Sequence, residues 1–166
     1  MFITSNILNK MDMETKSIEE VDQNAKWVIK SYKHKGVPKI TFNKWDLFNI
    51  RDKSIGIHYG IYHELPSNVS REYLEEINAT PKNITQIINF INNTKINDWI
   101  IIAKGGSDSL YCAQIASSYY YQELDDDNNN EFCRHRKRIK NIYKISNDFK
   151  RKFQFNTIST YNSIYL

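Results

Sequence analysis

The sequence has little cysteine, proline or glycine and no long apolar run. Its 166 residues include 2 Cys, 3 Pro and 5 Gly. Cys112 and Cys133 have neither the spacing of a metal site nor the number needed for a disulfide framework. No window holds about 18 apolar residues, and the first residues lack the apolar segment of a signal peptide. We therefore expect an intracellular protein, in the cytoplasm or nucleus, that does not enter a membrane.

The sequence also lacks a catalytic or metal-binding constellation. No serine lies in a nucleophile-elbow pattern, and neither cysteine has an evident partner. The Lys104-Gly105-Gly106-Ser107 turn lacks the P-loop pattern. The sequence has 4 histidines, and their spacing does not match that of metal ligands. They are His34, His58, His63 and His135. We therefore expect no enzyme, with no catalytic residue, no metal and no cofactor.

Composition indicates a single domain with an unevenly charged surface. Apolar residues make up 40% of the chain and charged residues 25%, which is ordinary for a soluble protein. The net charge is only +4, but residues 123–131 carry five acids, whereas residues 134–152 carry nine basic residues and one acid. A local concentration of Lys and Arg matters more for a polyanionic partner than the total charge does.

Hydrophobic patterning predicts a mixture of strands and helices. Residues 1–23 are expected to form an extension or short helix, and residues 24–166 a single domain. Runs rich in β-branched and aromatic residues predict strands at 26–32, 54–62, 99–103, 110–116 and 134–143. Capping residues predict helices at 17–21, 70–76 and 80–92. In the last of these, Pro81 follows the N-cap Thr80, and four isoleucines form one apolar face: Ile84, Ile87, Ile88 and Ile91.

Five segments, in this order, carry a resemblance to a known family. They are Trp27-Val28-Ile29-Lys30, the run Ser54–Tyr62 with Tyr59 at a family tryptophan, Asn97-Asp98-Trp99-Ile100, Ser117-Ser118-Tyr119-Tyr120-Tyr121 and the basic run His135–Asn141. The sequence resembles the PUA-like domains of the EVE type, especially those of modification-dependent restriction proteins (McrB-like and Mrr-like). That family has glycine at the positions of Asn97 and Ser117 and tryptophan at that of Asn141.

The resemblance implies both a fold and a function. The fold is α+β, a PUA-like (EVE/YTH-like) curved mixed β-barrel of five or six strands with two or three short flanking helices. The function is non-catalytic reading of DNA that carries N6-methyladenine or 5-methylcytosine, with the modified base flipped into an aromatic cage. The chain would then be the recognition module of a modification-dependent restriction or defence protein, whose partners include GTPase or nuclease domains.

The residues expected to bind nucleic acid fall into two groups. Stacking of an extruded base on aromatic rings recovers about 1–3 kcal/mol, which offsets the cost of flipping it. By position in the family, the base-binding residues are Tyr59, Tyr119, Tyr121 and Trp27. Basic side chains on a strand suit phosphate contact, which gives affinity without sequence information. These residues are Arg134, Arg136, Lys137, Arg138 and Lys140.

Plainer interpretations stay open beside these. The aromatic residues can instead belong to the core, although three successive tyrosines on a strand cannot all point inward. The basic residues can instead be a solvated edge that discourages unwanted strand pairing. An RNA reader of the PUA or YTH type and a protein-interaction adaptor are the alternative functions, with DNA favoured over RNA.

Overall fold

The structure is a computed structural model that describes residues 13–31, 50–104, 110–123, 134–146, 151–153, 158–160 and 163–165. All but Lys104 of the turn expected at residues 104–107, and most of the acidic loop expected at residues 123–131, lie outside the described residues.

The described part of the chain contains ten strands and four helical segments. The strands are β1 (Thr15–Lys16), β2 (Ala25–Ser31), β3 (Ser54–Ile57), β4 (Trp99–Lys104), β5 (Leu110–Ile115), β6 (Tyr120–Tyr121), β7 (His135–Ile145), β8 (Arg151–Phe153), β9 (Ser159–Thr160) and β10 (Ser163–Tyr165). The helical segments are α2 (Ile18–Asp22), α3 (Arg71–Glu76), α4 (Pro81–Ile88) and the π-helical turn η2 (Asn89–Asn93). The fold is therefore α+β, as the sequence predicts.

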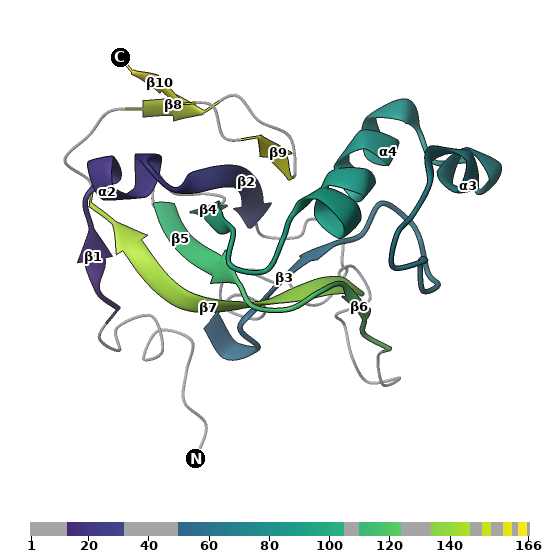
Figure 1. Cartoon of the computed structure of the whole chain (residues 1–166), viewed down its shortest axis with the longest axis horizontal. Coiled ribbons are helices and arrows are strands. Elements are labelled where there is room, and N and C mark those ends of the chain that lie inside the picture. The colour runs from purple at the N-terminus through teal and green to yellow at the C-terminus, as the bar shows by residue number, and fades with distance from the viewer. Residues whose placement is uncertain are drawn as a thin grey trace, which may run out of the picture.

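One curved sheet organises these elements (Figure 1). Its described strands run in the order β1-β7-β5-β4-β2-β9, with β3 and β6 both paired to β7. No pairing among the described residues joins β1 to β9, so the sheet is open and the expected closed barrel is not what the structure shows. Strands β8 and β10 form a separate antiparallel pair.

Strand β7 is the longest strand and connects two halves of the sheet. Its N-terminal half pairs antiparallel with β3 and β6, and its C-terminal half pairs with β5 and β1. Within the part that pairs with β5, β7 has one residue more than β5 between Lys140 and Tyr143, and Asn141 there has a φ of 50°. Asparagine tolerates this left-handed conformation better than most residues, and a bulge bends a strand. Asn141 is therefore suited to the position where β7 bends along β5.

Each face of the sheet is covered by its own apolar cluster. On one side, Ile29, Ile100 and Ile102 pack with residues of α3, α4 and η2, among them Leu74 and Phe90. On the other side, Val28, Ile101 and Cys112 pack with Val21 of α2. Alternate residues of a strand point to opposite faces, which explains why neighbouring β2 and β4 residues join different clusters. Cys112 is a small, fully buried core residue.

The helices begin where capping residues predict. Ser17 and Glu20 form a reciprocal capping box at the start of α2, and Val21 of this helix packs against the sheet. Ser70 caps α3, and Thr80 caps α4 with Pro81 in the first turn. The apolar face predicted for α4 packs against the sheet, with Ile84, Ile87 and Ile91 buried. None of the described helices is both long and apolar enough to cross a membrane.

Two strand predictions differ in outcome. The hairpin of β4 and β5 is confirmed, with Trp99 opposite Gln114 and Ala103 opposite Leu110. The strand predicted over 54–62 is too long, because β3 ends at Ile57. Tyr59 and Gly60 have φ values of 53° and 72°, and this left-handed backbone cannot continue an extended strand.

Candidate functional site

The basic residues of β7 do not form a single exposed row. Arg138 and Lys140 are exposed and Arg134 is half-buried, whereas Arg136 and Lys137 are only 4% and 2% exposed. β3 covers this half of β7 on one edge and β6 on the other. The expectation that Arg136 and Lys137 contact phosphate is therefore not met, because both side chains are enclosed by the fold.

Lys137 is a buried structural cation. Its Nζ donates to the Thr94 carbonyl at 2.8 Å, to Thr94 Oγ1 at 2.7 Å and to the Ile91 carbonyl at 3.4 Å. It also lies 5.7 Å from the centre of the Phe90 ring. These carbonyls end η2 and have no partner within the helix, so the ammonium caps it. Burial lowers the pKa of Lys137 to about 8.

Arg136 is held by an acidic residue from the segment before β3. Its Nη1 lies 3.3 Å from Asp52 Oδ2. Because Arg136 is buried, this pair fixes the approach to β3 against β7 and leaves the guanidinium away from solvent. Arg136 is therefore a positioning residue of the fold.

Tyr119 and His135 form a directed hydrogen-bond chain. His135 Nε2 is 2.8 Å from the Ile61 carbonyl, which can only accept, so Nε2 carries the proton. Nδ1 then accepts from the Tyr119 hydroxyl at 2.8 Å, and that hydroxyl accepts from the Leu65 N–H at 3.1 Å. Burial raises the pKa of Tyr119 to about 12 and lowers the pKa of His135. The chain therefore links β7 to the loop after β3 through a neutral imidazole.

This neutral imidazole predicts acid sensitivity. The pKa of His135 in the folded protein lies below the unfolded value of about 6.5, chiefly because of burial, with His63 and Arg134 adding to it. Below that value the unfolded state binds more protons, so stability falls as the pH decreases. We expect His135→Gln to flatten this dependence between pH 7 and 5 in urea unfolding experiments. An equally steep dependence in the variant would contradict this role.

The four residues expected to bind a base are distributed among three sets of contacts. Tyr119 and Tyr121 flank His135, with ring centres 5.9 Å and 5.2 Å from the imidazole. The Tyr59 hydroxyl donates to Gln86 Oε1 of α4, and Trp27 Nε1 donates to Asp98 Oδ2 at 3.3 Å. Trp27, Tyr59 and Tyr119 also pack against the apolar core. For these three, the plainer interpretation as core residues fits better than a solvent-facing cage.

A different group of aromatic and basic side chains does face solvent. Arg138 lies over the Tyr120 ring, with Cζ 5.3 Å from its centre, and Arg134 lies over the Tyr62 ring at 5.5 Å. Arg134 also donates to the Tyr121 hydroxyl at 3.3 Å. We call these residues the aromatic–basic edge: Tyr62, Tyr120, Tyr121, Arg134 and Arg138. Tyr62 is 54% exposed, and the other two tyrosines are half-buried.

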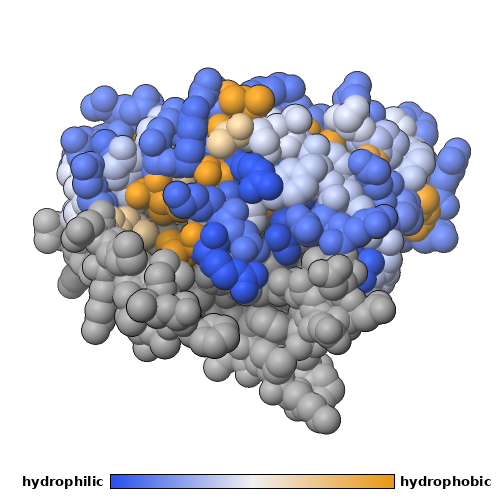
Figure 2. Space-filling model, turned by 90° about the horizontal axis from the view of Figure 1, so that it is seen from below, coloured by the Kyte–Doolittle hydropathy of each residue, from blue (hydrophilic) through white to orange (hydrophobic). Residues whose placement is uncertain are grey.

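The aromatic–basic edge lies where β6 pairs with the start of β7. The face seen from below Figure 1 is mainly hydrophilic in its described part, with small apolar areas beside strongly hydrophilic residues (Figure 2). The sequence predicted Tyr121, Arg134 and Arg138 of this edge as site residues, but not Tyr120, which it placed only in the tyrosine run, and not Tyr62. Its only sequence signal was an aromatic residue just past the Gly60 turn.

A polar pocket between α4 and β9 is a second feature that sequence reasoning missed. It has a volume of about 270 Å³, and its described lining comes from α4, its continuation η2, β9 and the residue before β9. Ile158, Ser159 and Thr160 are far from α4 in sequence, and no spacing pattern predicts that they meet it. Among the described residues, no group of His, Cys, Asp and Glu is arranged to hold a metal ion.

The fold defines a small α+β domain built on one open sheet, with an aromatic–basic edge and a separate polar pocket. Residues 43–166 match the model of a family described as a domain of unknown function, DUF8426, and the chain belongs to that family. No curated protein and no solved structure matches the chain. The match begins after β2, although β2 lies between β4 and β9 in the sheet.

Proposed function

We propose that this chain is a non-catalytic module that binds nucleic acid carrying a modified base, with DNA favoured over RNA. The aromatic–basic edge is the observation on which the proposal rests. Arg134 and Arg138 supply positive charge for phosphates, while Tyr62, Tyr120 and Tyr121 offer ring faces to an unpaired or extruded base. Proteins that bind unpaired bases combine these two features.

The resemblance to PUA-like domains of the EVE type supplies the finer part of the proposal. It suggests N6-methyladenine or 5-methylcytosine as the base, and a restriction or defence protein as the setting. One local feature supports it. Asn97 stands where that family has glycine, and its φ of 74° is a conformation that glycine adopts without strain. Because the described sheet is open and not a closed barrel, the relation to PUA-like domains is itself part of the proposal.

A binding panel tests the proposal directly. Otherwise identical labelled duplexes with adenine, N6-methyladenine, cytosine or 5-methylcytosine at one position are titrated with the protein, and fluorescence anisotropy is measured at several salt concentrations. We expect a salt-dependent affinity and a preference for one modified duplex. RNA of the same sequence, used as competitor, tests the choice of DNA. Binding with no preference would retain nucleic-acid binding but remove the reading of a modified base.

The double substitution Arg134→Ala/Arg138→Ala is expected to weaken DNA binding about tenfold or more at moderate salt. Each lost phosphate contact reduces the slope of log K against log salt by about 0.9, so two lost contacts reduce it by about 2. The same anisotropy titrations measure both quantities. Arg71→Ala is the matched control, because Arg71 is exposed on α3 and lies outside the edge. Equal affinities for the double variant and the control would rule out the edge as the binding surface.

A further inference from the structure

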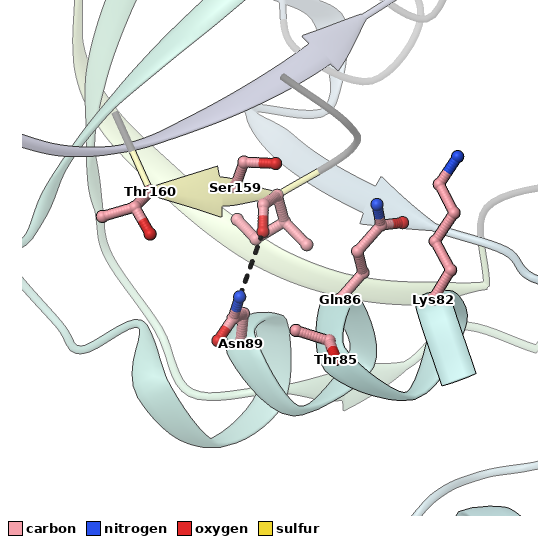
Figure 3. Close-up of a pocket in the computed structure, with 7 residues that line it drawn as sticks. Lys82, Thr85, Gln86, Asn89, Ser159 and Thr160 are labelled. Atoms are coloured by element: carbon pink, nitrogen blue, oxygen red, sulfur yellow. Dashed lines mark hydrogen bonds between the residues drawn. The ribbon is translucent and has the colours of Figure 1, made fainter. Parts of the chain in front are cut away.

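The pocket between α4 and β9 is lined mainly by polar residues, and a hydrogen bond joins its two sides. Its described lining residues are Lys82, Thr85, Gln86, Asn89, Ile158, Ser159 and Thr160 (Figure 3). Asn89 Nδ2 donates to the Ile158 carbonyl at 3.5 Å and so ties the segment before β9 to the helical side. The volume of about 270 Å³ lies just below the roughly 300 Å³ at which pockets for drug-sized ligands begin. The pocket therefore suits a small ligand.

Gln86 gives the pocket a hydrogen-bond donor. Its side chain is only 6% exposed, and its Oε1 accepts from the Tyr59 hydroxyl. Its Nε2 has no hydrogen-bond partner among the described residues, yet Gln86 lines the pocket. Nε2 can therefore donate to a ligand that carries an acceptor atom. Because Tyr59 occupies Oε1, the amide presents only N–H groups to a ligand.

Lys82 adds a positive charge next to this donor. Lys82 and Gln86 are four residues apart on α4, which places them on one side of the helix, and their side chains extend in the same direction in Figure 3. Lys82 is exposed and forms no ion pair with a residue in the described ranges. The ammonium and the amide can therefore act on one ligand.

The described lining residues favour one ligand class over two others. None of the seven is acidic, so these residues offer no carboxylate to a cation. None of the seven is aromatic, so these residues offer no ring on which a nucleobase could stack. A positive charge beside N–H donors instead matches the oxygen atoms of a phosphate or a similar oxyanion.

We propose that the pocket between α4 and β9 is an oxyanion site of the phosphate class, with Lys82 and Gln86 as its ligand-binding residues. Lys82 neutralises the charge, and Gln86 Nε2 donates from the floor of the pocket. Tyr59 is a positioning residue, because its hydroxyl holds the amide in the orientation that presents N–H₂. The site is separate from the aromatic–basic edge and does not depend on the function proposed for it.

The test is a titration of the full chain with inorganic phosphate in a phosphate-free buffer, followed by NMR at constant ionic strength. We expect saturable shifts of the Gln86 side-chain amide signals, which are assigned by their absence in Gln86→Glu. Sodium chloride in place of phosphate should leave these signals unmoved. Shifts that never saturate, or equal shifts with chloride, would overturn the proposal.

Two variants and a control separate the site from general charge effects. Lys82→Met should weaken phosphate binding about tenfold, the usual effect of losing one charged hydrogen bond. Gln86→Glu should abolish it, because a carboxylate of the same shape keeps the Tyr59 bond and repels the anion. Lys53→Met removes an exposed lysine outside the pocket and should bind as the unaltered chain does. Since Lys82 is on the surface, its variant is expected to fold, and unchanged binding by it would contradict the site.

A last arm distinguishes a free anion from a phosphate within nucleic acid. A short single-stranded oligonucleotide that shifts the same Gln86 signals and competes with inorganic phosphate would identify a backbone phosphate as the ligand. Phosphate binding without such competition would identify a free small anion. Failure of both would overturn the oxyanion site and leave DNA binding at the aromatic–basic edge unaffected, because Lys82→Met and the Arg134/Arg138 double variant are measured separately.

Discussion

Replacing Lys137 with alanine is expected to destabilise the fold by about 3 kcal/mol or more. Nζ of Lys137 donates to both oxygens of Thr94 and to the Ile91 carbonyl, and the side chain is 2% exposed. The substitution would leave these helix-terminal carbonyls without their donor and would open a cavity against Phe90. Both effects are costly in a packed interior.

The loss of stability is large because the buried ammonium is paired with three oxygen atoms, and all three lose their donor in the variant. Burial lowers the pKa of Lys137 to about 8, so at pH 7 the group still carries most of its proton inside the protein. The carbonyl dipoles at the end of η2, the Phe90 ring and the charge of Asp98 offset part of the loss of hydration. Lys137 therefore fixes how the π-helical turn ends over the sheet.

Urea unfolding, followed by tryptophan fluorescence, measures the effect of these substitutions. Lys137→Met should cost less than Lys137→Ala, because methionine restores most of the volume but none of the hydrogen bonds. Lys140→Ala, an exposed lysine on the same strand, should change stability by about 0.5 kcal/mol or less. If Lys137→Ala and Lys140→Ala lowered the free energy of unfolding equally, the buried ammonium would not cap the helix.

Local patterns were sufficient to predict most of the elements. Ser17, Ser70 and Thr80 each accept the N–H bond expected of an N-cap, and the apolar face of α4 is buried as its spacing predicts. These features depend on residues within a few positions of each other, and a capping bond or a helical stripe forms whatever lies across the sheet. The β4–β5 hairpin was also predictable, because its two strands are neighbours in the sequence.

The basic strand could not be interpreted in this way. Its basic composition predicted phosphate contact at Arg136, but burial of Arg136 depends on β3 pairing with it and on Asp52. Lys137 is buried because η2 ends above it, a relation across 43 residues of sequence. Nothing near Lys137 in the chain marks it as a helix cap. A run of basic residues in the sequence therefore predicts a local positive charge, but it does not predict which of the side chains reach solvent.

The candidate sites depend even more on long-range placement. Gln86 reads in the sequence as one polar residue on an amphipathic helix, and it becomes a pocket residue only because β9 lies beside α4 and Tyr59 reaches its oxygen. Likewise, no sequence pattern predicts that Arg134 lies over the ring of Tyr62. In both cases the contact joins segments whose pairing no local pattern determines.

The second large effect is expected at Asp98, which organises the turn between η2 and β4. Asp98 Oδ2 accepts from the Lys95 N–H at 2.9 Å and from Trp27 Nε1 at 3.3 Å, while Oδ1 pairs with Lys26 at 3.2 Å. Its own N–H donates to the Lys95 carbonyl. The positive φ of Asn97 fits the third position of a type II turn closed by this bond.

Asp98→Ala is expected to cost about 2–3 kcal/mol, because it removes charge-assisted bonds to a backbone N–H and an indole at once. Burial raises the pKa of Asp98, but the bonds from Lys95, Lys26 and Trp27 outweigh burial and lower it overall. The stabilisation is therefore complete above the unfolded pKa of about 3.9 and is lost as the pH falls through the folded value.

Unfolding of Asp98→Ala and of Asp98→Asn at pH 7 and pH 3 tests both parts of this expectation. Asparagine keeps one acceptor oxygen but no charge, so its loss should be smaller than that of alanine and should change little with pH. Glu76→Ala, which removes an exposed carboxylate on α3, is the matched control. If Asp98→Ala were no less stable than this control at pH 7, the turn would be held by its backbone alone. The position of Trp27 on β2 would then have to be fixed by its apolar packing.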